Sequence, residues 1–276
     1  MQKRILAVSD ISCLGKCALT TALPVLSACG HECVLLPTAV LSTHTAADFG
    51  DYTCEDLTHR LLPILQHWQR LEITFDAVYI GYLTTPAQAA LLTEQLPKLC
   101  REDTLWLVDP ILGDNGQLYR GLSAENIAAL RRLCQQADII TPNLTEAALL
   151  TDLSHDDTPS RLLDALSTLT DAQILLTGVP FDDAQIGILS RDKEGVVRAH
   201  ANPHIDGMLH GTGDLVASAL LGAYLCGVPL ADAASLAADF VAACIKRQKN
   251  HPDDRWYGLP FEQELGMLKQ GIDTYK

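Results

Sequence analysis

The sequence is poor in aromatic and in basic residues. Phe, Trp and Tyr make up 5% of the 276 residues, and Lys and Arg number 20 against 34 Asp and Glu, a formal net charge of −14. A surface this acidic is a poor partner for nucleic acid or for an anionic membrane. A local anion site remains possible, because backbone N–H groups can bind an anion without basic side chains.

The chain also lacks a long hydrophobic segment. Residues 1–5 include two basic residues but lead directly into a predicted strand, without the apolar stretch of a signal peptide. The apolar run at residues 215–231 is shorter than the roughly 20 residues of a membrane span, and it contains two glycines and a proline. We therefore expect a cytoplasmic protein that makes no membrane contact and buries this run as a core helix.

The cysteines lack the paired spacing of a metal site. There are nine of them, an odd number, they are scattered through apolar segments, and no C-x-x-C pair occurs. This distribution predicts free, buried thiols in a reducing compartment rather than disulfides or a structural zinc site.

Strand-like and helix-like segments alternate along almost the whole chain. The predicted strands are residues 5–8, 34–36, 38–41, 76–80, 104–108, 139–140, 173–176, 186–189 and 196–199. A turn is expected at residues 9–15 and a helix after it, ending at about 29. Further helices are expected at 55–70, 86–100 and 123–136, one that begins at 144 and one that follows residue 160. Two alanine-rich helices then run to about 249, and the tail from 251 is less regular. The alternation predicts one domain over residues 1–276, a three-layer α/β/α sandwich with a mostly parallel central sheet.

Polar side chains follow nearly every predicted strand. In α/β sheets the ligand lies beyond the carboxyl ends of the strands, so these side chains are expected to gather at one edge. They are Asp10, His44, Thr45, Tyr82, Asp109, Asp114, Asn143, Glu146, Thr177 and Asp214. This convergence is the main indication of an active site that comes from the residues alone.

The segment His210-Gly211-Thr212-Gly213-Asp214 runs directly into a strongly apolar predicted helix. Glycines let a ligand approach the unpaired N–H groups at a helix start, which favours an anion there. A carboxylate beside an anion repels it unless it handles a proton on the attacking group, so Asp214 hints at phosphoryl transfer to a hydroxyl. Taken alone, the segment is better explained by an acidic residue that the helix dipole favours.

Hard oxygen donors, which Mg²⁺ prefers, occur in the middle of the chain, at Asp109, Asp114, Asn143 and Glu146. By itself the Asn143-x-x-Glu146 spacing is that of a helix cap, with Asn143 as the N-cap. Together with the two aspartates we prefer a magnesium site, with contacts that can pass through water. Thr177-Gly178 offers a phosphate a hydroxyl and an open backbone, or forms a plain turn.

In order, these motifs resemble those of the ribokinase superfamily, and within it the pyridoxal/pyridoxamine (vitamin B6) kinases. The resemblance runs from residue 5 to about residue 249 and is carried by Ser42-Thr43-His44-Thr45, Gly81-Tyr82-Leu83, Asp109-Pro110-Ile111-Leu112-Gly113-Asp114, Thr141-Pro142-Asn143-Leu144-Thr145-Glu146 and Gly211-Thr212-Gly213-Asp214. The last three are similar to the family's DPVxGD, TPNxxE and GxGD segments.

The resemblance implies an ATP-dependent kinase for the hydroxymethyl group of a B6 vitamer. Carried over, Asp214 is the base, and the N–H groups of Gly211, Thr212 and Gly213 bind the phosphoryl group in transfer. The implied ATP-binding residues are Asp109, Asp114, Tyr119, Asn143, Thr177 and Gly178, with Mg²⁺ at Asp109, Asp114 and Glu146; the implied vitamer-binding residues are Ser9, Asp10, His44, Thr45 and Tyr82. Residues 113–121 resemble a mobile flap over ATP. Members of the family are commonly homodimers and often need K⁺.

Asp10 departs from the family pattern, in which a serine near the ring nitrogen follows the first strand. An aspartate there would pair with a protonated pyridinium nitrogen and raise the pKa of that nitrogen. Two alternatives stay open: Asp10 caps the following helix, or Ser9 takes the place of the family's serine.

Two other functions fit the same motifs. A hydroxymethylpyrimidine kinase of thiamin synthesis acts on a ring of similar size, although the loops at His44-Thr45 and Gly81-Tyr82 favour a B6 vitamer. A non-catalytic vitamin- or nucleotide-binding protein could use the same fold, but the intact segment 211–214 argues against lost catalysis.

Overall fold

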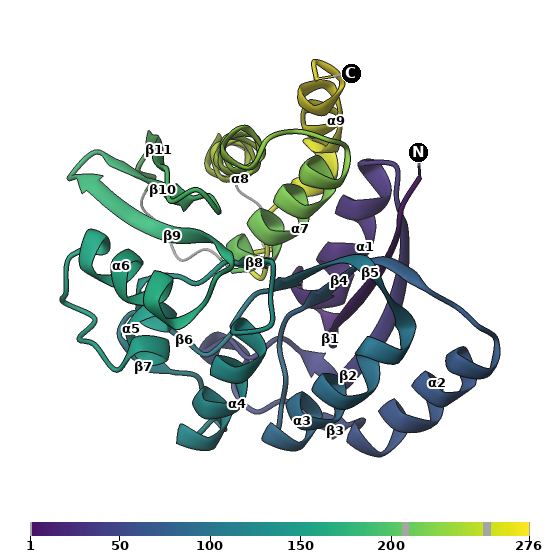
Figure 1. Cartoon of the computed structure of the whole chain (residues 1–276). Helices are drawn as coiled ribbons and strands as arrows, with labels where there is room; N and C mark the ends of the chain where they lie inside the picture. Colours follow the sequence, from purple (N-terminus) through teal and green to yellow (C-terminus); the bar gives the residue numbers. More distant parts are fainter. Residues whose placement is uncertain (1, 206–209, 251–254, 276) are drawn as a thin grey trace.

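The computed structural model describes residues 2–205, 210–250 and 255–275, and within them a nine-stranded sheet forms the centre (Figure 1). The sheet has the order β11-β10-β9-β8-β5-β4-β1-β2-β3. Its strands are β1 (Arg4–Leu14), β2 (Glu32–Thr43), β3 (Cys54–Asp56), β4 (Phe75–Ile80), β5 (Cys100–Val108), β8 (Ile139–Ile140), β9 (Gln173–Asp182), β10 (Gln185–Arg191) and β11 (Val197–Pro203). Neighbours from β2 to β9 pair in parallel, and β3, β10 and β11 add antiparallel pairs at the two edges, which confirms the mostly parallel sheet.

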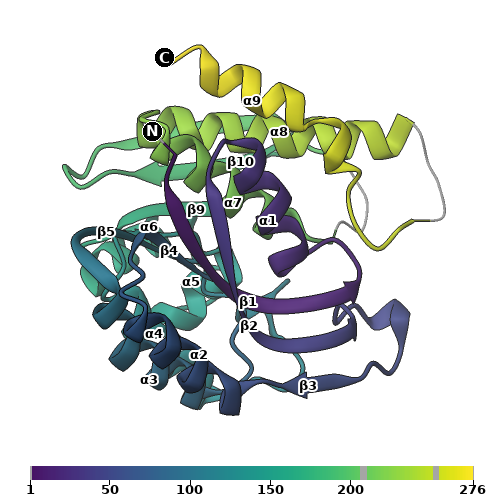
Figure 2. The ribbon, with the colours of Figure 1, turned by 90° about the vertical axis from the view of Figure 1, so that its right-hand side faces the viewer.

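Helices cover both faces of the sheet (Figure 2). One face carries α1 (Ala18–Ala28), α7 (Thr212–Leu225), α8 (Leu230–Asn250) and α9 (Leu265–Asp273). The other carries α2 (Thr58–Arg70), α3 (Pro86–Gln95), α4 (Ala124–Cys134), α5 (Leu144–Thr151) and α6 (Pro159–Leu169); short 3-10 helices are η1 (Ala47–Phe49), η2 (Leu96–Leu99) and η3 (Phe261–Gln263). Each face has its own apolar core, one containing Phe240 and the other Phe75. The predicted three-layer sandwich is therefore confirmed.

The start of β1 shows why the sequence reads there as a continuous apolar run. Ile5 and Ala7 belong to the core on one face, while Leu6 and Val8 belong to the core on the other, and all four are fully buried. Successive side chains of a strand point to opposite faces, so a sheet covered by helices on both sides needs apolar residues at every position.

Several predicted boundaries are wrong. The turn expected at residues 9–15 belongs to β1, which continues to Leu14 beside β2 past an irregularity between Ser9 and Ile11. The two segments 34–36 and 38–41 form one strand, β9 runs on past residue 176, and the tail contains α9. The loop expected at 113–116 is a hairpin of β6 (Gly113–Asp114) and β7 (Gln117–Leu118). Its Asn115 and Gly116 both have positive φ, as a two-residue type I′ turn requires.

The described part of the chain contains no helix that is both long and apolar enough to cross a membrane. All nine cysteines are free thiols, as predicted. The prediction that they are buried is wrong for Cys13 and Cys54, which are exposed.

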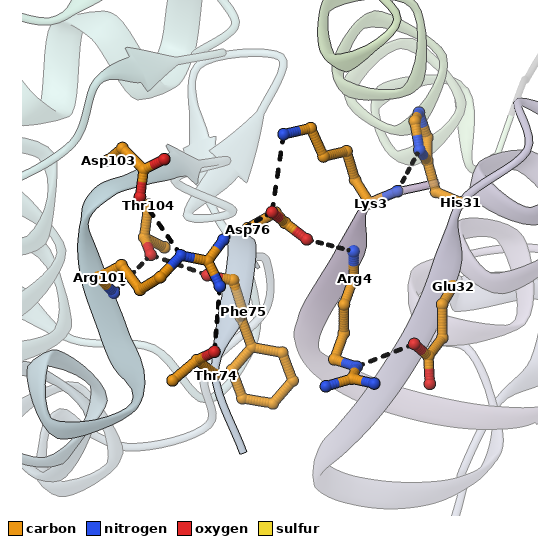
Figure 3. Close-up of polar contacts among 10 residues, drawn as sticks. All are labelled: Lys3, Arg4, His31, Glu32, Thr74, Phe75, Asp76, Arg101, Asp103 and Thr104. Atoms are coloured by element: carbon orange, nitrogen blue, oxygen red, sulfur yellow. Dashed lines mark hydrogen bonds and ion pairs between the residues drawn. The ribbon is translucent and has the colours of Figure 1, made fainter. Parts of the chain in front are cut away.

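An ionic cluster around Asp76 joins the amino-terminal ends of β1, β4 and β5 (Figure 3). Asp76 accepts hydrogen bonds from the backbone N–H of Arg4 at 2.7 Å and from the guanidinium of Arg101 at 2.6 Å, and the Lys3 ammonium lies 3.6 Å away. Burial alone would raise the pKa of Asp76, but the bonds from Arg4 and Arg101 hold it below its usual range. The cluster thus fastens three central strands at the edge opposite their carboxyl ends.

We expect Asp76→Asn to lower the free energy of unfolding by about 1–2 kcal/mol near neutral pH, because hydrogen bonds to a charged group contribute about that much. The folded-state pKa is depressed, so this contribution is present above the unfolded-state pKa and is lost as pH falls through the folded-state pKa. Urea unfolding of both proteins near neutral pH and in acid measures the difference, which should shrink in acid.

Asp103→Asn is the matched control, because the Asp103 side chain is 79% exposed and contacts Arg101 at 3.4 Å. Its effect should stay below about 0.5 kcal/mol. Equal losses at the two positions would show that Asp76 contributes no more than a surface charge.

Candidate active site

The carboxyl ends of the central strands lie in one row. Backbone hydrogen bonds continue past the strand ends. The N–H groups of Gly81 and Asp109 donate to the carbonyl oxygens of Val8 and Ile80, both at 2.8 Å. The N–H groups of Thr141 and Thr177 donate to the carbonyl oxygens of Val108 at 3.2 Å and Pro142 at 2.9 Å. These bonds bring the polar residues that follow β4, β5 and β8 to the same edge as Ser9 and Asp10 within β1 and Thr177 within β9. The start of α7 lies against this edge, because its first residues contact the turn between β1 and α1.

Asp214, the third residue of α7, is only 9% exposed. Its buried Oδ1 has no hydrogen-bond partner among the described residues. Burial raises the pKa of Asp214 to about 7; a hydrogen bond from the backbone N–H of Ala18 opposes this shift, and the charge of Asp10 adds to it. An unpaired carboxylate oxygen with a pKa near neutrality suits a general base. Asp214 also lies in the first turn of α7, where the helix dipole favours a carboxylate, so the simpler explanation expected from the sequence applies beside this one.

Gly211 and Gly213 have different surroundings. Gly211 has a φ of 78°, and a Cβ there would lie 2.0 Å from the carbonyl oxygen of Lys16, so the fold itself requires glycine. A Cβ on Gly213 would meet no atom of residues 2–205, 210–250 or 255–275 within 4 Å, and the residue is exposed. The first N–H groups of a helix have no partner within the helix, so Thr212 and Gly213 present donors to open space, as an anion site requires.

Asp10 lies close enough to both Asp214 and Tyr82 for its charge to affect them. Asp10 is buried, and its Oδ2 accepts a hydrogen bond from the Ser12 hydroxyl at 3.0 Å. Burial raises the pKa of Asp10, and the charge of Asp10 in turn contributes to raising the pKa values of Tyr82 and Asp214. The alternative that Asp10 caps the next helix is wrong, since the N-cap of α1 is Cys17.

The other predicted vitamer-binding residues are Ser9, His44 and Thr45, and the first two form hydrogen bonds within the protein. The Ser9 hydroxyl accepts a hydrogen bond from the backbone N–H of Tyr82 at 3.0 Å, which ties β1 to the end of β4. His44 Nε2 lies 2.9 Å from the carbonyl oxygen of Tyr257, and Nδ1 accepts from the N–H of Ala46 at 3.2 Å, so both ring nitrogens are engaged within the protein. Thr45 is exposed.

Asp109 and Glu146 are buried carboxylates, each 4% exposed. Asp109 Oδ1 accepts a hydrogen bond from the Thr141 hydroxyl at 2.9 Å. Burial raises the pKa of Asp109 to about 8, with a further rise from the charge of Asp214. Burial also raises the pKa of Glu146, with a further rise from the charge of Asp109. Three carboxylates that disfavour each other's ionisation make a site that a cation stabilises.

Asn143 and Glu146 form the capping box that their spacing predicts. The N–H of Glu146 donates to Asn143 Oδ1, and the N–H of Asn143 donates to Glu146 Oε2, both at 2.9 Å. Glu146 Oε1 also accepts from the N–H of Leu112 at 3.2 Å, and Asn143 Nδ2 donates to the carbonyl oxygen of Gly113 at 2.9 Å. The pair therefore anchors the segment that leads into the β6–β7 hairpin.

Over residues 2–205, 210–250 and 255–275, no three His, Cys, Asp or Glu side chains stand close enough to hold a metal ion together. The donor set still fits Mg²⁺, because Asp109 is a buried carboxylate that needs positive charge nearby. Mg²⁺ typically uses one or two carboxylates and completes its shell with water and substrate phosphates.

The β6–β7 hairpin carries Asp114 and leads to Tyr119, both exposed. Burial raises the pKa of Tyr119, and the charges of Glu146, Asp114, Asp214 and Asp109 raise it further. The Tyr119 hydroxyl is therefore near these four carboxylates. The N–H of Gly116 donates to the Thr145 hydroxyl at 2.9 Å, which fastens the tip of the hairpin to α5.

Thr177 and Gly178 adjoin the start of α5. Thr177 and Asn143 form an isolated parallel bridge, and the Thr177 hydroxyl lies 3.4 Å from the carbonyl oxygen of Pro142. Gly178 has a φ of 68°, and a Cβ there would meet nothing within 4 Å. The backbone at Gly178 is thus open to a ligand at this end of the row, while the Thr177 hydroxyl donates to Pro142 and its oxygen remains able to accept a further hydrogen bond.

The turn from Lys16 to Ala18 was not among the predicted site residues. Ala18 has a φ of 50°, unusual for alanine, and its N–H meets Asp214. No local motif marks this role, because the partner is almost 200 residues away in the sequence.

The chain is similar to known proteins over most of its length. Residues 27–255 match the model of the phosphomethylpyrimidine kinase family. The pyridoxine/pyridoxal/pyridoxamine kinase of Bordetella pertussis is 30% identical over 249 residues, which cover 85% of this chain and 86% of that protein. Among solved structures, pyridoxal kinase from Lactobacillus plantarum has a TM-score of 0.91 and 34% identity, covering 100% of this chain and 99% of the other. A putative phosphomethylpyrimidine kinase from Bacteroides thetaiotaomicron, in a crystal form with pyridoxal, has a TM-score of 0.91 and 33% identity, covering 97% and 96%.

Proposed function

Because the chain belongs to the phosphomethylpyrimidine kinase family, we propose that it transfers the γ-phosphoryl group of ATP to the 5′-hydroxymethyl group of a B6 vitamer. The observation that carries the proposal is the buried, unpaired Oδ1 of Asp214 beside the open backbone of Gly213. A proton acceptor and an anion-binding helix start at adjacent positions are what transfer to a hydroxyl requires.

In this mechanism the vitamer hydroxyl points at Asp214, which takes its proton as the oxygen attacks the γ-phosphorus, while the bond from that phosphorus to the bridging oxygen breaks and ADP leaves. The N–H groups of Gly211, Thr212 and Gly213 stabilise the charge on the phosphoryl oxygens, and preorganised donors of this kind supply several kcal/mol of transition-state stabilisation. Thr177, Gly178 and Asn143 contact the other phosphates of ATP. Mg²⁺ held by Asp109, and through water by Asp114 and Glu146, would neutralise phosphate charge. Tyr119 and the hairpin cover the nucleotide and exclude water.

Asp10, Tyr82 and neighbouring residues form the vitamer pocket in this proposal. A buried carboxylate whose side-chain partner is a single hydroxyl is costly unless a cation joins it. A protonated pyridine nitrogen supplies that cation, and the aromatic ring packs against Tyr82. The relatives named for pyridoxal support a B6 vitamer over hydroxymethylpyrimidine, which remains the second candidate.

ADP release with ATP and Mg²⁺ against pyridoxal, pyridoxamine, pyridoxine and hydroxymethylpyrimidine tests the proposal. We expect turnover with at least one B6 vitamer. Turnover with the pyrimidine alone would move the protein to thiamin synthesis. Saturable vitamer binding without ADP release would instead establish a binding protein.

We expect Asp10→Ser to raise the KM of the vitamer while leaving the KM of ATP unchanged, because the ion pair with the pyridinium is lost. The effect should be largest where Asp10 is ionised and the ring nitrogen is protonated. It should vanish as pH rises above the pKa of the bound ring nitrogen, where no cation remains to be paired. Steady-state kinetics across pH measure the ratio of the two KM values. A ratio of one at every pH would remove Asp10 from the vitamer site.

A further inference from the structure

We propose that the C-terminal segment at residues 257–262 is a positioning element for phosphoryl transfer, acting on the start of α7 through Lys16. The inference rests on the proposed function, since it concerns the loop that binds the phosphoryl group. Its basis is a continuous set of contacts from the C-terminal segment through Lys16 to Gly211 and Asp214.

The first half of this path joins the C-terminal segment to Lys16. The N–H of Lys16 donates to the carbonyl oxygen of Tyr257 at 3.4 Å, and its ammonium lies 2.9 Å from Glu262 Oε2 and 5.5 Å from the ring centre of Phe261. A Cβ on Gly258 would lie 2.4 Å from the Cβ of Lys16 and 3.1 Å from its backbone nitrogen. Lys16 is therefore held at its backbone, along its stem and at its charged end.

The second half joins the same turn to the catalytic groups. The carbonyl oxygen of Lys16 would lie 2.0 Å from a Cβ on Gly211, and the Cα of Cys17 would lie 3.7 Å from it. One residue further, the backbone N–H of Ala18 lies near enough to Asp214 to lower the pKa of that carboxyl. A shift of the Lys16–Ala18 turn therefore moves both the backbone that contacts Gly211 and the N–H that favours the ionised base.

A second contact fixes the residue before the loop. The ring of His210 packs 4.9 Å from the ring of His44 and 6.0 Å from that of Trp256, measured between ring centres. Trp256 in turn packs 4.5 Å from Phe49. Residues near the C-terminus therefore reach the start of α7 at two points. They contact His210 directly, through Trp256, and they contact Gly211 through Lys16.

Lys16 acts here as a positioning residue rather than a phosphate ligand. Its ammonium is engaged by Glu262 and lies over Phe261, so its charge is already paired within the protein. Phosphoryl transfer depends steeply on position, and a displacement of about 1 Å can lower a rate roughly 10²-fold. Contacts that fix the turn therefore act on kcat more than on substrate binding.

Gly258→Ala tests the path at its tightest point, and Gly266→Ala in α9 is the matched control, because a Cβ there would meet nothing within 4 Å. Gly258 is buried and does not have a positive φ, so alanine acts through its contact with Lys16. We expect Gly258→Ala to lower kcat roughly 10- to 100-fold with both KM values within about twofold of wild type. Gly266→Ala should leave kcat unchanged.

The pH profile supplies a readout that loss of stability does not move. The N–H of Ala18 lowers the pKa of Asp214, so displacing the turn weakens this bond and shifts the acidic limb of the kcat profile to higher pH. Glu262→Gln, which adds no volume, should shift kcat and this limb in the same direction by a smaller amount.

The outcomes separate this inference from the proposed function. Absence of turnover in the wild type would contradict the proposed function itself. Normal wild-type turnover with a Gly258→Ala kcat and pH profile equal to those of Gly266→Ala would overturn the role of the C-terminal segment. So would a loss in Gly258→Ala confined to the KM values or to thermal stability.

Discussion

Asp214→Asn is expected to lower kcat by about 10²- to 10⁴-fold, the range that a positioned general base contributes. Asparagine has the shape of aspartate but cannot accept the proton of the vitamer hydroxyl. The KM values should change little, because the anion-binding N–H groups of Gly211 to Gly213 remain. Steady-state ADP release with saturating ATP and vitamer measures the loss.

The same substitution is expected to preserve or raise stability. Burial holds the pKa of Asp214 at about 7, above its unfolded-state value, so the ionised carboxylate disfavours folding progressively as pH rises above the unfolded-state value. Asparagine removes this penalty, and thermal unfolding above neutral pH should show a melting temperature at least equal to that of wild type. A fully active variant, or one that is inactive only because it unfolds, would contradict the assignment of Asp214 as base.

Gly213→Ala is expected to lower kcat/KM for ATP by about 10²- to 10³-fold, comparable to the loss of one oxyanion donor. The added methyl group meets no atom of the described residues within 4 Å and instead enters the space assigned to the phosphoryl group. Alanine also favours a helix over glycine by about 1 kcal/mol, so the free energy of unfolding should stay constant or rise. Kinetics and urea unfolding of the same preparation measure both effects.

Gly211→Ala is the matched comparison two residues earlier. There the φ of 78° and the contact with the carbonyl oxygen of Lys16 predict loss of stability together with activity. If Gly213→Ala keeps full activity, no ligand approaches the start of α7 at that point, and the anion site lies elsewhere.

The fold could be predicted largely because its signals are local. Alternating strands and helices indicated a covered parallel sheet, and the cap at Asn143 followed from the spacing of three residues to Glu146. The row of polar residues followed from one general property of such sheets, that their carboxyl ends share an edge. Asn115-Gly116 is an equally local signal for a hairpin, although residues 113–116 were expected to form a loop.

What could not be predicted depends on contacts between distant parts of the chain. Lys16 meets Glu262, 246 positions later, and the N–H of Ala18 meets Asp214. His44 stands in a polar loop that resembles a substrate loop, yet both of its ring nitrogens are engaged within the protein. Neither hydrophobic periodicity nor motif spacing contains such information, because packing between elements decides which side chains remain available to a ligand.

The most direct test of the proposed activity is the stoichiometry of product formation with pyridoxal, ATP and Mg²⁺. Phosphorus NMR and mass spectrometry of the reaction should show pyridoxal phosphorylated at its 5′-oxygen in amounts equal to the ADP released. ADP accompanied by inorganic phosphate and unmodified pyridoxal would contradict the account, because Asp214 would then activate water instead of the vitamer hydroxyl.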